Sequence, residues 1–180
     1  MSSNTLPANV IAANPFFADK AAAPQAAPAG FREHTVRREY LMDKSADAVW
    51  AWLNNPDTFT KGQIPPWRVE FVSADPDTPA GFHEGGLNVH HGPFTLFAGT
   101  MTEIREGEYR DLQYFYGSHF LSLRLVRPTR LQFWVEAQGD EQTKVTLQLD
   151  SLVRRWFAPI WSFGNRCFWK MFGFWIRRQA

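Results

Sequence analysis

The segment from Trp67 to Val153 contains one short strand pattern after another and no long helical pattern. Polar stretches such as REGE, RPT and QGDEQ separate the patterns, which are WRVEFVS, EGGLNVHH, FTLFAGTMTEI, YRDLQYFY, FLSLRLV, RLQFWVEA and TKVTLQLDSLV. Antiparallel strands can be joined by such short loops, whereas parallel strands need long crossovers. The segment therefore predicts an antiparallel sheet built from hairpins.

Residues 31–61 predict one more strand and two short helices. FREHTVRREYLM alternates between apolar and polar residues and reads as a strand. Ser45 is suited to cap a helix over ADAVWAWL, and Asp47 in the first turn favours the helix dipole. Asn55-Pro56 ends that helix, and a second short helix is expected from about Pro56 to Lys61.

The stretch FAPIWSFGNRCFWKMFGFWIRR, residues 157–178, predicts one long C-terminal helix with Pro159 in its first turn. Basic residues recur too often for a membrane span. On an ideal helix Ser162, Arg166, Lys170, Gly173 and Arg177 form a narrow solvated stripe flanked by Trp169. The opposite side is expected to be buried and carries Ile160, Phe163, Cys167, Phe168, Met171, Phe172, Phe174 and Trp175.

Together these patterns predict an α+β protein, in which a curved sheet of about seven strands holds the long helix against its concave face. Ala and Pro supply fourteen of the first thirty residues, so residues 1–30 are expected to be a flexible arm and residues 31–180 the folded domain. A single cysteine, Cys167, excludes an internal disulfide and suggests a cytoplasmic protein. The net charge of +1 argues against nucleic-acid binding.

The order of elements and three segments resemble the START-like superfamily, also called SRPBCC. The segments are VRREYLMDKSADAVWAWLNNPDTFTKG, GTMTEIREGEYRDLQYFY and TKVTLQLDSLV, and the resemblance covers about residues 33–178. The superfamily includes lipid-transfer domains, pollen-allergen-like proteins, polyketide cyclases and coenzyme-Q-binding proteins. The resemblance implies a helix-grip fold, with a seven-stranded sheet wrapped around the final helix and a hydrophobic cavity between them.

Metal and nucleophilic chemistry find little support in the sequence. HEGGLNVHH lacks the spacing of a helical zinc motif, and His90 and His91 are adjacent on a predicted strand, so they point to opposite faces. No serine stands in a Gly-x-Ser-x-Gly elbow, and no glycine-rich stretch has the context of a nucleotide-binding loop. We therefore expect neither a metal site nor a cofactor.

Strand alternation selects the residues that would face a cavity. From the sheet these are Val89, His91, Leu112, Tyr114, Tyr116, Phe133, Val135 and Leu147, and from the helix Phe168, Met171, Phe172 and Trp175. The leading hypothesis is binding or transfer of a hydrophobic small molecule such as a lipid, isoprenoid quinone or polyketide. An alternative is a cyclase or dehydratase that uses His91 with Tyr114 or Tyr116 as acid and base. A third is transient contact with an anionic membrane surface through the basic helix.

Overall fold

The computed structural model describes residues 27–61, 66–73, 77–92, 96–116 and 122–179. Most of the expected arm, residues 1–30, lies outside this part of the chain. The first described strand starts at Phe31. None of the described helices is long and apolar enough to cross a membrane.

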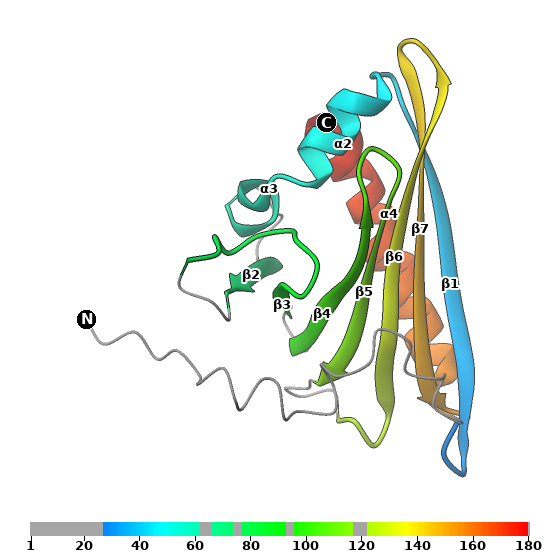
Figure 1. The fold of residues 1–180 in the computed structure, drawn as a ribbon. Coiled ribbons are helices and arrows are strands. Elements are labelled where there is room, and N and C mark those ends of the chain that lie inside the picture. Colours follow the sequence, from blue (N-terminus) through cyan, green and yellow to red (C-terminus); the bar gives the residue numbers. More distant parts are fainter. Residues whose placement is uncertain (1–26, 62–65, 74–76, 93–95, 117–121, 180) are drawn as a thin grey trace.

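Seven strands form one antiparallel sheet in the order β1-β7-β6-β5-β4-β3-β2 (Figure 1). Consecutive strands from β2 to β7 are neighbours, and β1 closes the order by pairing with β7 over its whole length. The antiparallel sheet is therefore confirmed. Its strands are β1 (Phe31–Met42), β2 (Arg68–Val72), β3 (Leu87–His91), β4 (Leu96–Arg105), β5 (Tyr109–Tyr116), β6 (Val126–Gly139) and β7 (Gln142–Arg154).

Two short helices and one long helix complete the fold, as expected. Helix α2 (Ala46–Leu53) begins after Ser45, whose hydroxyl accepts from the Ala48 backbone N–H at 3.4 Å. Helix α3 (Pro56–Thr60) begins after Asn55, whose side chain caps it in the same way. Helix α4 (Ala158–Gln179) lies across one face of the sheet (Figure 1). The α+β helix-grip arrangement is confirmed.

The prediction of separate strands on either side of Arg127-Pro128-Thr129 is wrong. These residues lie inside β6, which runs from Val126 without a turn. Pro128 lacks a backbone N–H, and it is tolerated here because β5 pairs with β6 only from Arg130 onward. A register shift between Pro128 and Arg130 accommodates the proline.

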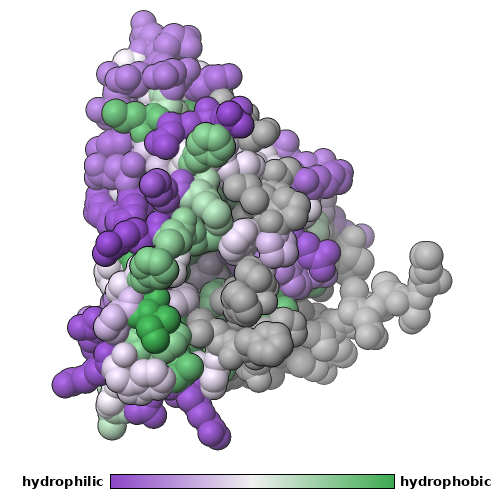
Figure 2. Space-filling model, turned by 180° about the vertical axis from the view of Figure 1, so that it is seen from behind, coloured by the Kyte–Doolittle hydropathy of each residue, from purple (hydrophilic) through white to green (hydrophobic). Residues whose placement is uncertain are grey.

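Helix α4 buries a narrower face than the sequence predicts. Trp169, Phe172, Trp175 and Ile176 are buried, as is Gly173, which was assigned to the solvated stripe. Several apolar residues expected to be buried are exposed instead, because the sheet covers only one side of the helix. Figure 2 shows them as a hydrophobic row crossing the surface diagonally, formed by Ile160, Phe163, Met171 and Phe174, and Cys167 is also exposed.

Gly173 is the point where α4 approaches the sheet most closely, against Tyr40 of β1. A Cβ atom added at Gly173 would lie 2.9 Å from Tyr40 Cδ1, and still closer to Cε1. The Tyr40 ring is held in place because its hydroxyl donates to the Trp169 carbonyl oxygen at 2.9 Å. Gly164 lies nine residues earlier on the same helix. A Cβ atom added there would have no described atom within 4 Å.

Replacing Gly173 by alanine is therefore expected to lower the free energy of unfolding by about 1–2 kcal/mol, since overpacking outweighs the gain in helix propensity. The same change at Gly164 should raise the free energy of unfolding by up to about 1 kcal/mol, because only the propensity gain remains. Urea unfolding of both variants measures the difference. Equal shifts in the two variants would contradict the close approach at Gly173.

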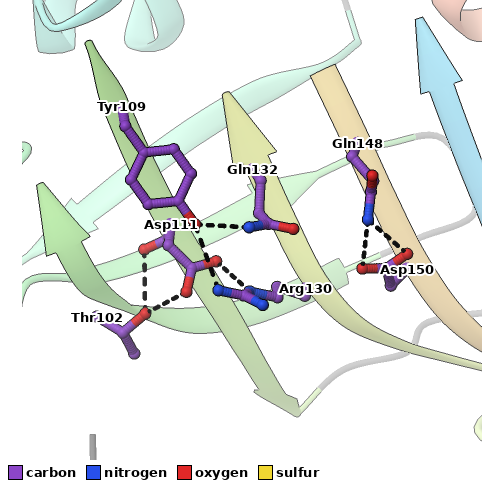
Figure 3. A network of polar contacts seen from close by, with 7 residues as sticks. All are labelled: Thr102, Tyr109, Asp111, Arg130, Gln132, Gln148 and Asp150. Carbon is purple, nitrogen blue, oxygen red and sulfur yellow. Dashed lines mark hydrogen bonds and ion pairs between the residues drawn. The ribbon is translucent and has the colours of Figure 1, made fainter. Parts of the chain in front are cut away.

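The sheet face away from α4 carries a polar network that joins β4, β5 and β6 (Figure 3). Asp111 lies at its centre, with its side chain 2% exposed, and accepts from Arg130 Nε at 2.8 Å and from the Thr102 hydroxyl at 2.8 Å. The Tyr109 hydroxyl accepts from Arg130 and from Gln132. On β7, Gln148 donates to Asp150 in a separate contact. The network fixes the neighbouring strands β4, β5 and β6 side by side.

Candidate functional site

A cavity of about 410 Å³ lies between the sheet and α4. Leu112, Leu131 and Phe133 line it from the sheet, and Phe168 and Phe172 line it from the helix. Rings also form its walls elsewhere, as Trp67 contacts Phe168 at a centroid distance of 5.3 Å. Such an enclosure favours an apolar guest, because aromatic walls offer dispersion contacts and few hydrogen bonds.

One end of the cavity carries three neighbouring polar side chains, from β3 and β5. The Tyr114 hydroxyl lies 3.2 Å from His90 Nδ1, and the two rings meet edge to face at 5.6 Å. Asn88 is fully buried, and neither its amide nitrogen nor its oxygen has a hydrogen-bond partner among the described residues. These groups are positioned to bind a polar part of a guest.

Burial determines the protonation states of His90 and Tyr114. Burial, with the positive charge of Arg110 as a second cause, lowers the pKa of His90 to about 3. Burial also raises the pKa of Tyr114 well above its usual range. At neutral pH the His90 ring is therefore neutral, with one donor and one acceptor nitrogen, and Tyr114 keeps its proton.

Arg110 of β5 also lines the cavity and is 4% exposed. Its Nη1 donates to the Leu53 carbonyl oxygen at 2.5 Å and to Asn54 Oδ1 at 3.3 Å, at the C-terminal end of α2. The guanidinium carbon lies 4.1 Å from the centroid of the Phe82 ring and 4.6 Å from that of Phe133. Burial lowers the pKa of Arg110 to about 9, so the group remains a cation at neutral pH.

Six of the residues selected from the sequence line this cavity: His91, Leu112, Tyr114, Phe133, Phe168 and Phe172. The structure places the others elsewhere. Val135, Leu147 and Trp175 are buried in the core away from the cavity, Val89 is half-buried outside it, and Met171 is exposed. The side chain of Tyr116 lies outside the described part of the chain.

His90 was not predicted as a cavity residue because the sequence analysis assigned the wrong alternate residues of β3 to the inward face. The sequence favoured Leu87, Val89 and His91 for the inward face, but Asn88 and His90 occupy it. His91 is also among the residues that line the cavity, and its Nε2 lies 3.1 Å from Glu70 Oε2 of β2. The histidine that contacts Tyr114 is therefore His90, whereas the sequence analysis had named His91.

Arg110 was also not predicted as a cavity residue, although strand alternation places it on the inward face of β5. Residues 110, 112 and 114 share one face of a strand, and Leu112 and Tyr114 were already placed toward the cavity. A charged residue at the third position of that face was not expected, because an arginine in a core needs compensation that the sequence does not display.

Comparison with known proteins gives matches in structure only. No family model matches the sequence, and no curated protein matches it either. The Mll3558 protein of Rhizobium loti has a TM-score of 0.58 at 15% identity, over 81% of this chain and 98% of that one. Norcoclaurine synthase from Thalictrum flavum, as a point mutant in complex with a transition-state analogue, has a TM-score of 0.54 at 15% identity, over 72% of this chain and 82% of that one.

The Zhui aromatase/cyclase from Streptomyces sp. R1128 has a TM-score of 0.52 at 14% identity, over 68% of this chain and 70% of its own. All three likenesses extend over most of the sheet-and-helix domain, at identities that report on fold. They agree with the strand order and with the helix laid across the sheet. The chain therefore shares the helix-grip fold of these three proteins.

Proposed function

We propose that the protein binds a hydrophobic small molecule of the lipid, isoprenoid quinone or polyketide class in the cavity under α4 and holds it for transfer. The observation that carries this proposal is the cavity of about 410 Å³ with aromatic walls on both the sheet and the helix. Its volume falls within the usual range of ligand pockets, about 300–1,000 Å³. Solved proteins of the same fold support it, since one is described in complex with dopamine and hydroxybenzaldehyde.

The first experiment is native mass spectrometry of freshly purified protein, followed by organic extraction of whatever is bound. A stoichiometric apolar compound is the expected result. Protein that purifies empty and also binds no fluorescent fatty acid would overturn the proposal. A variant that closes the cavity gives this experiment its control.

Gly164→Trp is that variant, because Gly164 lines the cavity and has open space where a side chain would begin. The indole should occupy the space of the guest and lower its affinity at least about tenfold, a loss of about 1.4 kcal/mol. Gly164→Ala is the matched control, since it also replaces the glycine by a better helix former but adds no bulk. Full retention of the guest by the tryptophan variant would contradict binding in this cavity.

A second candidate function is acid–base chemistry of the cyclase or dehydratase kind on the bound guest. It is favoured by one observation, the contact of neutral His90 with the Tyr114 hydroxyl inside the cavity. We expect His90→Gln to abolish turnover of the extracted guest while its binding changes little, and His91→Gln to retain turnover. Product analysis by liquid chromatography and mass spectrometry measures both. Equal turnover in all three proteins would exclude this role for His90.

A further inference from the structure

The cavity has a one-sided charge pattern. Two arginines and two histidines are among its described lining residues, namely Arg68, Arg110, His90 and His91, whereas no aspartate or glutamate is among them. Of the two arginines, Arg68 is exposed and therefore solvated, but Arg110 is buried. The electrostatic potential inside the cavity is thus determined mainly by a single buried cation.

Arg110 is only partly compensated by the protein. Carbonyl oxygens at the end of α2 and the faces of Phe82, Phe133 and Phe59 stabilise the guanidinium. These are partial charges, and no described carboxylate forms an ion pair with Arg110. Burying a full charge without an opposite charge is costly. An anion brought into the cavity would therefore be attracted strongly, in surroundings that screen the attraction little.

Three neutral polar groups line the same cavity as Arg110 and can complete such a site. The Asn88 amide has two donor hydrogens without a described partner, and it is fully buried in the cavity wall. The contact between the Tyr114 hydroxyl and the neutral His90 ring uses one of their two donor hydrogens, so the pair can donate one more hydrogen bond, from His90 Nε2 or from the Tyr114 hydroxyl. Donors that surround an oxyanion close to a cation form a recognition site that apolar walls alone do not require.

We propose that the hydrophobic guest carries one ionised oxygen group, a carboxylate or an acidic phenol or enol, which binds at the polar end formed by Asn88, His90 and Tyr114 and is attracted by the buried charge of Arg110. The remainder of the guest lies among the aromatic walls. This inference rests on the proposed function, because it concerns the same cavity. It narrows the guest from hydrophobic compounds in general to amphipathic acids.

The test compares two probes of nearly equal shape, 2-naphthoic acid and 2-naphthamide, by titration calorimetry at neutral pH. We expect the wild-type protein to bind the carboxylate at least about tenfold more tightly than the amide, which corresponds to about 1.4 kcal/mol. Arg110→Met should abolish this preference, and Arg110→Lys should retain part of it because the charge remains. Circular dichroism and urea unfolding establish that each variant is folded.

Arg110 also holds the end of α2, so its variants can lose stability as well as charge. Asn88→Leu keeps Arg110 and removes a donor, and it should weaken naphthoate binding more than naphthamide binding. A third probe, 7-hydroxycoumarin, reports ionisation directly, because its phenolate absorbs at longer wavelength than its phenol. The bound coumarin should ionise at lower pH in the wild-type protein than in free solution, and this difference should shrink in Arg110→Met.

The possible outcomes distinguish a failure of the anionic-group inference from a failure of the proposed hydrophobic binding. If naphthoate and naphthamide bind tightly and equally, the proposal of hydrophobic binding stands, and the inference that the guest carries an anionic group is overturned. A failure to bind either probe, or any fluorescent fatty acid, would overturn both. Preference for the carboxylate that persists in folded Arg110→Met and Asn88→Leu proteins would place the anion elsewhere and overturn the assignment of these residues.

Discussion

Replacing Arg130 by methionine is expected to lower the free energy of unfolding by about 3 kcal/mol, at the lower end of the range for breaking a buried ion pair. The reason is the unequal burial of the pair on the outer face of the sheet. The Asp111 side chain is 2% exposed and that of Arg130 is 41% exposed. Without Arg130, the Asp111 carboxylate stays buried with Thr102 as its remaining side-chain partner among the described residues.

The reverse change is expected to cost much less. Asp111→Asn leaves a half-exposed guanidinium that water can solvate, and the new amide can still contact Thr102, so a loss of about 1 kcal/mol is expected. The double variant should be more stable than Arg130→Met alone, because no buried charge remains without a partner. Urea unfolding of the three proteins measures these differences. Equal losses in both single variants would show that the burial of Asp111 does not govern the energetics.

Acid is expected to destabilise the protein through His90. Its pKa is about 3 in the folded state, against about 6.5 in an unfolded chain. Between these values the unfolded chain binds a proton that the folded protein does not, so stability is complete above pH 6.5 and falls as the pH decreases. The expected contribution is up to about 1.4 kcal/mol per pH unit, or about 2–3 kcal/mol between pH 6.5 and pH 4.5.

His90→Gln isolates this contribution, because glutamine retains hydrogen bonding and does not titrate. His90 contacts Tyr114, which stays neutral over this range, and the charges of Arg110 and His91 contribute to lowering the pKa of His90. The pKa of His34, on β1, is lowered as well, so the informative quantity is the difference between wild type and variant. The free energy of unfolding of the wild type minus that of the variant should rise as the pH increases from 4.5 to about 6.5. Parallel stability curves from pH 4.5 to pH 7.5 would contradict a neutral His90 with a strongly lowered pKa.

The fold could be predicted largely from local patterns in the sequence. Alternation, the Ser45 cap, the break at Asn55-Pro56 and the lack of a long helical pattern in the sequence from Trp67 to Val153 each report on structure formed by nearby residues. The error at Pro128 is of another kind, since a proline normally interrupts a strand. Whether it can lie within one depends on which neighbour is present at that position, and this is known only after the sheet is assembled.

The site was harder to predict. Its residues depend on which face of each strand points inward and on how much of α4 the sheet covers. On β3 the inward face carries Asn88 and His90, so hydrophobicity points to the wrong side of the strand. On α4 the apolar arc is wider than the strip that the sheet can cover, and nothing local distinguishes Phe172, which is buried, from Phe174, which is exposed. Both questions are decided by tertiary packing.

The exposed row on α4 also bears on how a guest would travel to the cavity. Ile160 belongs to both features, because it is 57% exposed on the outside of the helix and also lines the cavity. Phe163 lies beside it on the outer row, and Phe168 lies inside. A compound sparingly soluble in water could thus cross from the outer row into the cavity by exchanging one apolar contact for another. The rate of loading would then follow the free area of this row, independently of the affinity set at the polar end.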